Sequence, residues 1–466
     1  MKIARILPLA LILAGCAVGP DYRRPDIDLP NSFDQGGDAD AVADIVADKW
    51  WTQYADPVLN ELVANALERN TDMRIAVARI EEADANLRET GAAFLPEIDL
   101  GTTATRSRVS SRTALPNPAP LVRNDVRLAL STSFEIDFWG RLRRVREAAR
   151  AQALASRYAR EVVRLSLASL VTQAYFSLRA IDAQIVTTQD SLNTRRESLN
   201  VVQARINGGL ASDLDLNQAQ GSLADASVQL RDLQRQRVLL EHQLGTLTGK
   251  LNLTVATAPE FTTNVPPLPA VGLPSRLLDR RPDVRQAEQA MVSSNAQIGV
   301  AKAAYFPTIT LNANDGGEST TLATVLSNGA RIWSVGLGAT VPLLDYGRTS
   351  SRVDAARARE EQALASYQKA AETAYREVAD ALTNLQQTSA AVSDLELRAE
   401  ATRNALRIVS ARYQSGYSAY LDVLDAQRSA NEASLALSRN RLTQLNASVD
   451  LFKALGGGWD VSAAQK

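Results

Sequence analysis

Two side-chain types that carry much enzyme chemistry are nearly absent from this chain of 466 residues, which has one cysteine and one histidine. A disulfide needs two thiols, a zinc site usually needs several Cys or His ligands, and a histidine-based triad would depend on His242 alone. His242 lies among leucines of a predicted helix, where a lone imidazole is interpreted as a hydrogen-bonding group on the helix surface or between helices. The sequence contains no nucleophile elbow, metal-ligand cluster or phosphate-binding loop. We therefore expect no enzyme, no metal and no cofactor, with a hydrolase built on helices as an alternative.

The single cysteine, Cys16, lies in a setting that predicts lipid attachment. A basic and then apolar start ends in the sequence LAGC at residues 13–16, which resembles the bacterial lipobox. Residues 1–15 are thus predicted to be a signal peptide, and Cys16 to carry a diacylglycerol and a fatty acyl group such as palmitate. More than one acyl chain makes membrane anchoring stable. Because Ala17 follows the cysteine, where aspartate would favour retention in the inner membrane, we expect delivery to the outer membrane.

Charge and hydropathy exclude two further classes of protein. The 51 basic and 52 acidic side chains leave a formal net charge of −1, so no nucleic-acid partner is implied. An arginine-rich stretch at residues 141–146 is interpreted as a solvated or inter-subunit helix face. After residue 16, no run approaches the roughly 20 apolar residues of a membrane-spanning helix.

The chain is a tandem duplication. Its two copies match at an offset of 207 residues from Gly140 onward. In the earlier part, from Asp72 to Pro96, they match at an offset of 211 residues. A proline-rich stretch separates them, as expected for an extended connector. The predicted organisation is a lipidated N-terminal segment (16–55), repeat 1 (56–253), a linker (254–276), repeat 2 (277–456) and a C-terminal tail (457–466).

Each repeat is predicted to contain a helix, a β-hairpin and a long helical hairpin. The β-hairpins, at about 97–138 and 308–342, alternate apolar with small or polar residues. The stretches 141–205 and 348–412 lack Gly and Pro, and each would span about 100 Å as a helix. A returning helix with a coiled-coil spacing follows, so the helical hairpins cover about 141–249 and 348–455.

Four strands with one apolar face are too few to close a barrel. Open sheet edges are not tolerated in lipid, so copies must associate to give 8, 12 or 16 strands for two, three or four chains. The helical hairpins would continue such a barrel as a coiled-coil cylinder in the periplasm. The alternatives are a soluble sheet packed on the helices, and a lipid-anchored coiled-coil scaffold without a pore.

The turns between the long helices are where the two repeats differ in chemistry. Residues shared by both copies are interpreted as structural, and these include Arg205, Gly209, Arg412 and Gly416. Only repeat 2 has long polar or acidic side chains at these positions, and they are Tyr413, Tyr417, Tyr420 and Asp425. Asp422 is shared with Asp215 of repeat 1, and lies three residues before Asp425 on the same helix face.

Several short motifs together resemble the TolC-like outer-membrane efflux lipoproteins of the NodT type. They are residues 18–25 after the lipobox, Trp50-Trp51, the Asp-aromatic-Gly-Arg strand exits at 137–141 and 345–348, and residues 420–426. The resemblance covers nearly the whole chain. It implies a fold that is mostly α with a membrane β-barrel, in which a homotrimer completes a 12-stranded barrel continued by a periplasmic α-helical tunnel.

The same resemblance implies a function. The chain would be the passive outer-membrane conduit of a tripartite export system, working with a periplasmic adaptor and an inner-membrane pump of the RND type that select the cargo. It also implies a periplasmic gate in which Tyr413, Asp422 and Asp425 occupy contact and acidic-ring sites, although both aspartates would also suit ordinary solvated positions in a first helical turn. The family can place an arginine in the closing network where this chain has Ser418, which argues against a salt-bridge latch of that form.

Overall fold

The computed structural model describes residues 17–33, 48–112, 121–258, 261, 265–267, 271 and 274–459. Cys16 and the predicted signal peptide lie outside the described residues. The chain forms two compact units, each built from segments of both repeats. Unit 1 comprises Met1–Asp26, Arg79–Ser156 and Gln286–Tyr367, and unit 2 comprises Ile27–Ala78, Arg157–Arg285 and Gln368–Lys466. Among the described residues, no helix is both long enough and apolar enough to cross a membrane.

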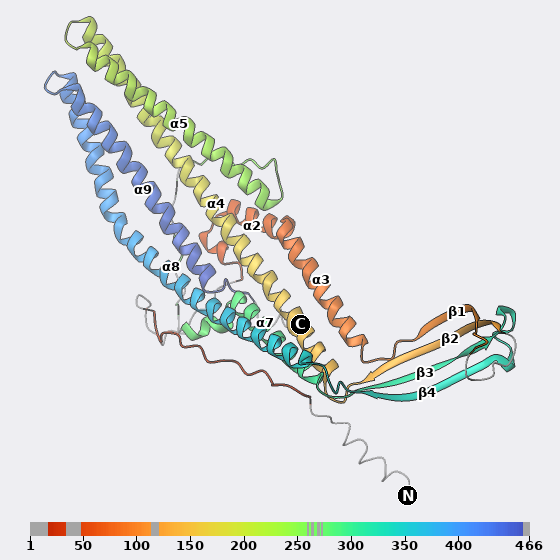
Figure 1. Cartoon of the computed structure of the whole chain (residues 1–466). Coiled ribbons are helices and arrows are strands. Elements are labelled where there is room, and N and C mark those ends of the chain that lie inside the picture. Colours follow the sequence, from red (N-terminus) through yellow and green to blue (C-terminus); the bar gives the residue numbers. More distant parts are fainter. Residues whose placement is uncertain are drawn as a thin grey trace. The chain divides into compact units, whose positions relative to one another are not determined.

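Unit 1 contains one antiparallel sheet with the strand order β1-β2-β3-β4 (Figure 1). The two hairpins predicted from alternation are present, and β2 of repeat 1 pairs with β3 of repeat 2. The first strand of each hairpin is longer than the apolar residues alone indicate, because the alternation fades into small polar residues there. The strands are β1 (Asp99–Arg108), β2 (Val122–Ile136), β3 (Thr308–Ser319) and β4 (Arg331–Thr340).

The two faces of this sheet differ sharply in polarity. One face carries large apolar side chains that are exposed in the single chain, among them Leu100, Trp333 and Leu337. The other face is hollowed by a cavity of about 460 Å³ lined by small and polar side chains such as Thr103, Ser131 and Asn312. Period-two alternation in a strand produces this division directly, since successive side chains point to opposite faces.

The helical hairpins are long, and the two repeats match in position. The outgoing helices α4 (Arg141–Asn207) and α8 (Arg348–Gln414) have 67 residues each, and the returning helices are α5 (Asp213–Thr248) and α9 (Tyr420–Ala454). Asp137 caps the start of α4 by accepting from the backbone N–H of Leu142 at 3.0 Å, and Asp345 caps α8 through Thr349 at 2.9 Å. These aspartates give each strand-to-helix junction a satisfied first turn.

In repeat 1 the predicted helix before the β-hairpin is interrupted, and in repeat 2 a break between two helices lies at the equivalent position. In repeat 1, α2 (Pro57–Arg69) and α3 (Thr71–Ala92) meet at Asn70, whose side chain accepts from the N–H of Asp72 at 2.8 Å and so caps α3. In repeat 2 the break is at Arg281, 211 residues later, between α6 (Leu277–Arg280) and α7 (Pro282–Ala303). The remaining short helices are η2 (Trp50–Tyr54), η3 (Pro274–Arg276), η4 (Leu322–Thr324) and η5 (Asn328–Ala330).

The predicted coiled-coil seam forms the inner face of the returning helices. Ala219, Leu230 and Leu244 of α5 are buried, as the spacing predicts. Arg237 interrupts the seam because it forms an ion pair with the buried carboxylate of Asp182, at 2.7 Å. The sequence pattern located the arginine but contained nothing to identify its partner.

Candidate functional site

The turns at the ends of the two helical hairpins have the same backbone design. Gly209 and Gly416 adopt left-handed φ values of 72° and 86°, which favour glycine. The next N–H in each turn, from Leu210 or Tyr417, donates to the carbonyl oxygen five residues back at 2.8 Å. This pattern closes the last helical turn with a glycine at the C′ position. Gly209 and Gly416 therefore occupy the positions that make the turns.

The two hairpins of one chain are held together near these turns by a small apolar cluster. Tyr413, Tyr420, Val423, Val202 and Ala219 are its buried members, and they come from α8, α9, α4 and α5. The Tyr413 and Tyr420 rings lie 5.4 Å apart. Figure 1 shows both turns at the same end of the helices of unit 2. We call these five residues the tip cluster.

Arg205 connects the tip cluster to the turn of repeat 2. Its guanidinium donates to the Tyr413 carbonyl oxygen and lies over the Tyr413 ring, with the central carbon 4.7 Å from the ring centroid. A cation over an aromatic face is favourable by about 0.5–2 kcal/mol, depending on burial. Arg412, the equivalent residue of repeat 2, is exposed. The arginines that looked interchangeable in sequence thus lie in different surroundings.

Burial raises the pKa of both tyrosines in the tip cluster. It raises the pKa of Tyr420 to about 12, and burial is also the main cause of the raised pKa of Tyr413. Both hydroxyl groups therefore stay protonated at physiological pH. Among the described residues, the Tyr413 hydroxyl is buried without a hydrogen-bond partner.

The other predicted gate residues lie on the surface. Tyr417 is 78% exposed, unlike Tyr413 and Tyr420, which the subunit buries. Asp422 accepts from the N–H of Ala419 at 3.2 Å, and Asp425 pairs with Arg428 at 2.9 Å. The structure thus brings Tyr413 and Tyr420 together, and presents Tyr417, Asp422 and Asp425 outward.

Asp422 and Ser418 both make local contacts. Asp215, the equivalent of Asp422 in repeat 1, accepts from the Ser212 N–H at 3.0 Å in the same way, so this pair of aspartates serves the first helical turn. Ser418 donates to the Val409 carbonyl oxygen at 3.5 Å. Ser418 thus makes a neutral contact at the position where the family can carry an arginine.

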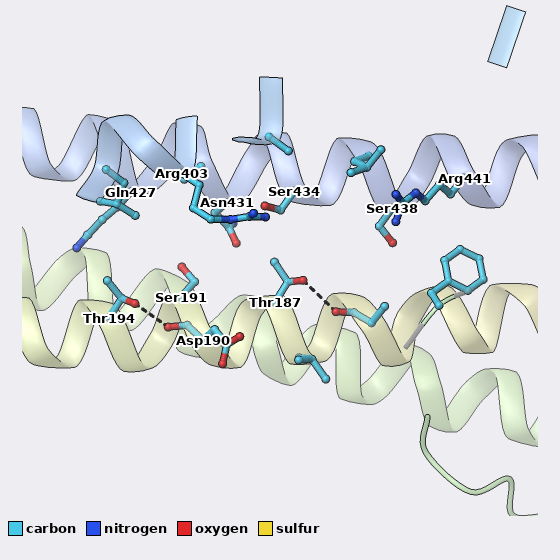
Figure 2. Close-up of a pocket in the computed structure, with 17 residues that line it drawn as sticks. Thr187, Asp190, Ser191, Thr194, Arg403, Gln427, Asn431, Ser434, Ser438 and Arg441 are labelled. Atoms are coloured by element: carbon cyan, nitrogen blue, oxygen red, sulfur yellow. Dashed lines mark hydrogen bonds between the residues drawn. The ribbon is translucent and has the colours of Figure 1, made fainter. Parts of the chain in front are cut away.

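A polar pocket lies further along the helices of unit 2. It has a volume of about 430 Å³ between α4, α8 and α9, and Figure 2 shows Asp190, Thr194, Arg403 and Asn431 on its walls. Thr194 donates to the backbone oxygen of Asp190 at 3.0 Å, which leaves the threonine hydroxyl committed to its own helix. The described residues contain no group of three His, Cys, Asp or Glu side chains placed to hold a metal ion. This pocket is a groove between helices.

The segment after Cys16 is held firmly in unit 1. The Val18 N–H donates to the Trp139 carbonyl oxygen at 2.9 Å, where β2 ends and α4 begins. Arg144 is buried and pairs with Asp21 at 2.8 Å. These contacts place Val18 and Asp21 beside the junction between sheet and helix. The prediction that the arginines at 141–146 form a solvated or inter-subunit helix face is wrong for Arg144, which is buried against Asp21 of its own chain.

Comparison with known proteins agrees with this architecture. The sequence profile of the outer membrane efflux protein family matches residues 62–250 and 273–457, one match for each repeat. The chain is 33% identical to the toluene efflux pump outer membrane protein TtgF of Pseudomonas putida, over 98% of this chain and 97% of TtgF. It is 32% identical to the cation efflux system protein CusC of Escherichia coli, over 98% and 100%.

A solved structure shows the same fold. The outer membrane channel MtrE of Neisseria gonorrhoeae, in its open state, superposes with a TM-score of 0.82 at 31% identity, covering 95% of this chain and 98% of MtrE. A tandem, mostly helical chain with one shared four-stranded sheet is thus an outer-membrane channel protein. The chain belongs to the outer membrane efflux protein family. The predicted tandem-repeat fold and the resemblance to efflux channels are confirmed: it is an outer-membrane component of an efflux system and extends into the periplasm.

Proposed function

We propose that three copies of this chain form a passive conduit through the outer membrane. Each copy would supply four strands to a 12-stranded barrel, and the helical hairpins would continue it as a periplasmic tunnel. The conduit catalyses no reaction and takes its driving force from an inner-membrane pump of the RND type, to which a periplasmic adaptor connects it. Relatives of similar identity are named for toluene and for cation efflux, which supports selection of the cargo by pump and adaptor.

The observation that carries this proposal is the sheet of unit 1. It has two outer strands, β1 and β4, and an apolar face with Trp333 and Leu337 exposed by 70% and 69%. A soluble protein would cover such a face, whereas lipid requires it and also requires that the strand edges be paired. The hollow polar face then suits a water-filled interior. Association of copies is the arrangement that satisfies both faces and both edges.

Acylation of Cys16 would fasten this assembly to the membrane. Val18, two residues after Cys16, donates its N–H to the Trp139 carbonyl oxygen at the strand-to-helix junction. In a barrel, that junction lies at the periplasmic surface of the bilayer, so acyl chains on Cys16 would reach the adjacent lipid leaflet. Diacylglycerol and fatty acyl groups are the covalent additions we propose.

Planar bilayers test the conduit directly. Purified full-length protein should insert and give discrete single-channel currents, and native mass spectrometry from detergent should give the mass of three acylated chains. A lipid-anchored scaffold without a pore would give neither steps in current nor barrier loss in liposomes. That result would reject the conduit in favour of the scaffold.

The exposed carboxylate of Asp425 is expected to set ion preference at the periplasmic mouth. In a trimer it would repeat as an acidic ring, which favours cations. Replacing Asp425 with alanine should lower the cation-over-anion permeability ratio roughly 2–5-fold, since a nearby unit charge is worth about 1 kcal/mol in water. The reversal potential across a KCl gradient measures this ratio.

Asp380 provides a matched control for Asp425. It is also an exposed helical aspartate that pairs with an arginine, Arg376, at 3.5 Å, but it lies far along α8 from the turn. Asp380→Ala should leave the reversal potential unchanged. Equal shifts for the two variants, or none for either, would remove Asp425 from the gate. Stability should not separate them, because exposed ion pairs contribute about 0–1 kcal/mol.

A further inference from the structure

We infer that the outer end of the sheet binds a phosphorylated lipid head group through Arg106 and Arg108 of β1. The ligand is a phosphate-bearing lipid of the outer leaflet. Its acyl chains would lie on the apolar face of the sheet, and its phosphate would contact the two guanidinium groups. This inference rests on the proposed barrel, because only a sheet inserted in the membrane presents its apolar face to lipid.

The charged side chains of the sheet divide unequally between its two faces. Residues directly paired on neighbouring strands share a face, so the register assigns each charged residue to one side. The apolar face has three arginines and one aspartate, for a net charge of +2, and these are Arg106, Arg108, Arg331 and Asp315. The hollow polar face has two arginines and four carboxylates, for a net charge of −2, and these are Arg123, Arg127, Asp99, Asp125, Glu135 and Glu318. The positive charge therefore lies on the side that would meet lipid.

Arg106 and Arg108 lie at the end of β1 that is remote from the helices. At the other end of the sheet, β1 follows α3 and β2 leads into α4. Because the helices extend into the periplasm, the two arginines lie toward the outer leaflet. They follow Leu100 by about 20 and 27 Å along the strand. The apolar band of a barrel is about 25 Å tall and its strands tilt by about 35–45°, so the arginines lie where this band meets the head groups.

Trp333 supports this depth for the arginines. It is 70% exposed on the same face, and its equivalent in repeat 1 is Val126, which pairs with Ala104. The repeat therefore places Trp333 at the level of Ala104, two residues before Arg106. Aromatic side chains form girdles at the interfaces of outer-membrane barrels, and arginine on the lipid side is tolerated near those interfaces but not at the bilayer centre.

Repeat 2 balances its arginine at this level, whereas repeat 1 does not do so in the same way. Arg331 is the equivalent of Asn124, which pairs with Arg106, so each hairpin has one arginine at the same level. The Arg331 Nε donates to Asp315 at 3.2 Å. The equivalent of Asp315 in repeat 1 is Ala104. The net positive charge of the apolar face thus comes from β1.

Arg106, Arg108 and Asn124 provide the donors that a lipid phosphate needs. The two arginines are exposed and, two residues apart on one strand face, lie about 7 Å from each other. Guanidinium groups stay charged and bind phosphate oxygens in a bidentate manner. Asn124 is exposed opposite Arg106 and adds an amide donor. Below them, Leu100 and Leu130 are exposed by 68% and 49%, which provides an apolar surface for acyl chains.

Native mass spectrometry of the full-length, acylated protein in detergent tests this site. The probe is lipid A that carries its phosphates, compared with dephosphorylated lipid A of the same acyl composition. The unchanged protein should bind the phosphorylated form at least tenfold more tightly. The double variant Arg106→Gln with Arg108→Gln should lose this preference, and each single variant should lose roughly fivefold, the effect of one arginine near an anionic lipid surface.

Arg127→Gln is the matched control. It removes an exposed arginine of the neighbouring strand β2, but from the hollow polar face. Its binding of phosphorylated lipid A should equal that of the unchanged protein. Inorganic phosphate at the same concentration as the lipid should not displace it, because inorganic phosphate has no acyl chains to place on the apolar face.

Three results would overturn this site. They are equal binding of the two lipid A forms to the unchanged protein, an equal loss in Arg127→Gln and the double variant, and displacement of lipid A by inorganic phosphate, which would assign the arginines to the free anion. Planar-bilayer currents separate the site from the conduit. Currents from the unchanged protein together with any of these results would leave the conduit standing, whereas an unchanged protein that gives no current and binds neither lipid A form would overturn both.

Discussion

Replacing Tyr413 with alanine is expected to increase the open probability of the periplasmic mouth about tenfold. Tyr413 is buried in the tip cluster, packs on Tyr420, and receives Arg205 on both its ring and its carbonyl oxygen. Truncating a buried aromatic side chain costs about 3–5 kcal/mol. If a third of that cost falls on the closed arrangement alone, the equilibrium shifts about tenfold, since about 1.4 kcal/mol corresponds to a factor of ten. Single-channel recording measures the open probability.

Tyr413→Phe separates two ways in which this residue could keep the periplasmic mouth closed: packing of its ring, or a hydrogen bond of its hydroxyl. Phenylalanine keeps the packing and the contact with Arg205, but removes the hydroxyl, which has no partner among the described residues of its own subunit. If packing within the subunit holds the turn, Tyr413→Phe should behave like the unchanged protein. If the buried hydroxyl itself is needed to hold the mouth closed, the phenylalanine variant should open as the alanine variant does. Unchanged gating in Tyr413→Ala would remove the tip cluster from the gate.

The largest loss of stability is expected at Trp50. Its side chain is 1% exposed and stacks on Phe452 of α9 with ring centroids 5.4 Å apart, while Trp51 and Tyr54 contact its edges. Trp50→Ala should lower the free energy of unfolding by about 3–5 kcal/mol, through lost burial and the cavity left behind. Guanidinium unfolding in detergent, followed by helical circular dichroism at one fixed protomer concentration, measures the change.

Two further substitutions serve as controls for Trp50→Ala. Trp50→Phe keeps a ring against Phe452, so it should lose less than half as much stability. Val228→Ala removes a side chain that is 67% exposed on α5 and should change stability by no more than about 0.5 kcal/mol. A Trp50→Ala loss no larger than that of Val228→Ala would show that these aromatic contacts do not hold the N-terminal segment to α9. The conductance of the folded protein should be unaffected.

The close match between the repeats allowed the helices and turns of this fold to be predicted from the sequence. Helices α4 and α8 begin at Arg141 and Arg348, 207 residues apart, as the repeat requires. A duplicated turn needs the same glycine twice, and Gly209 and Gly416 both adopt left-handed φ values. Arg205 and Arg412 are equivalent in the repeat, but Arg205 contacts Tyr413 whereas Arg412 is exposed. Arg205 of repeat 1 contacts repeat 2 within the chain. Arg412 of repeat 2 is exposed to solvent in the single chain.

The amino-acid sequence by itself determined the local structure of this protein: the duplication, the alternation that makes strands two-faced, the Gly- and Pro-free stretches that make long helices, and the glycines that end them. These properties depend on residues close together in the chain. Tertiary structure alone decided that Tyr413 and Tyr420 are buried while Tyr417 is exposed, that Arg237 neutralises Asp182, and that Arg144 holds the segment after Cys16. Each of those outcomes depends on which distant segments come into contact, and periodicity in one segment carries no information about its partner.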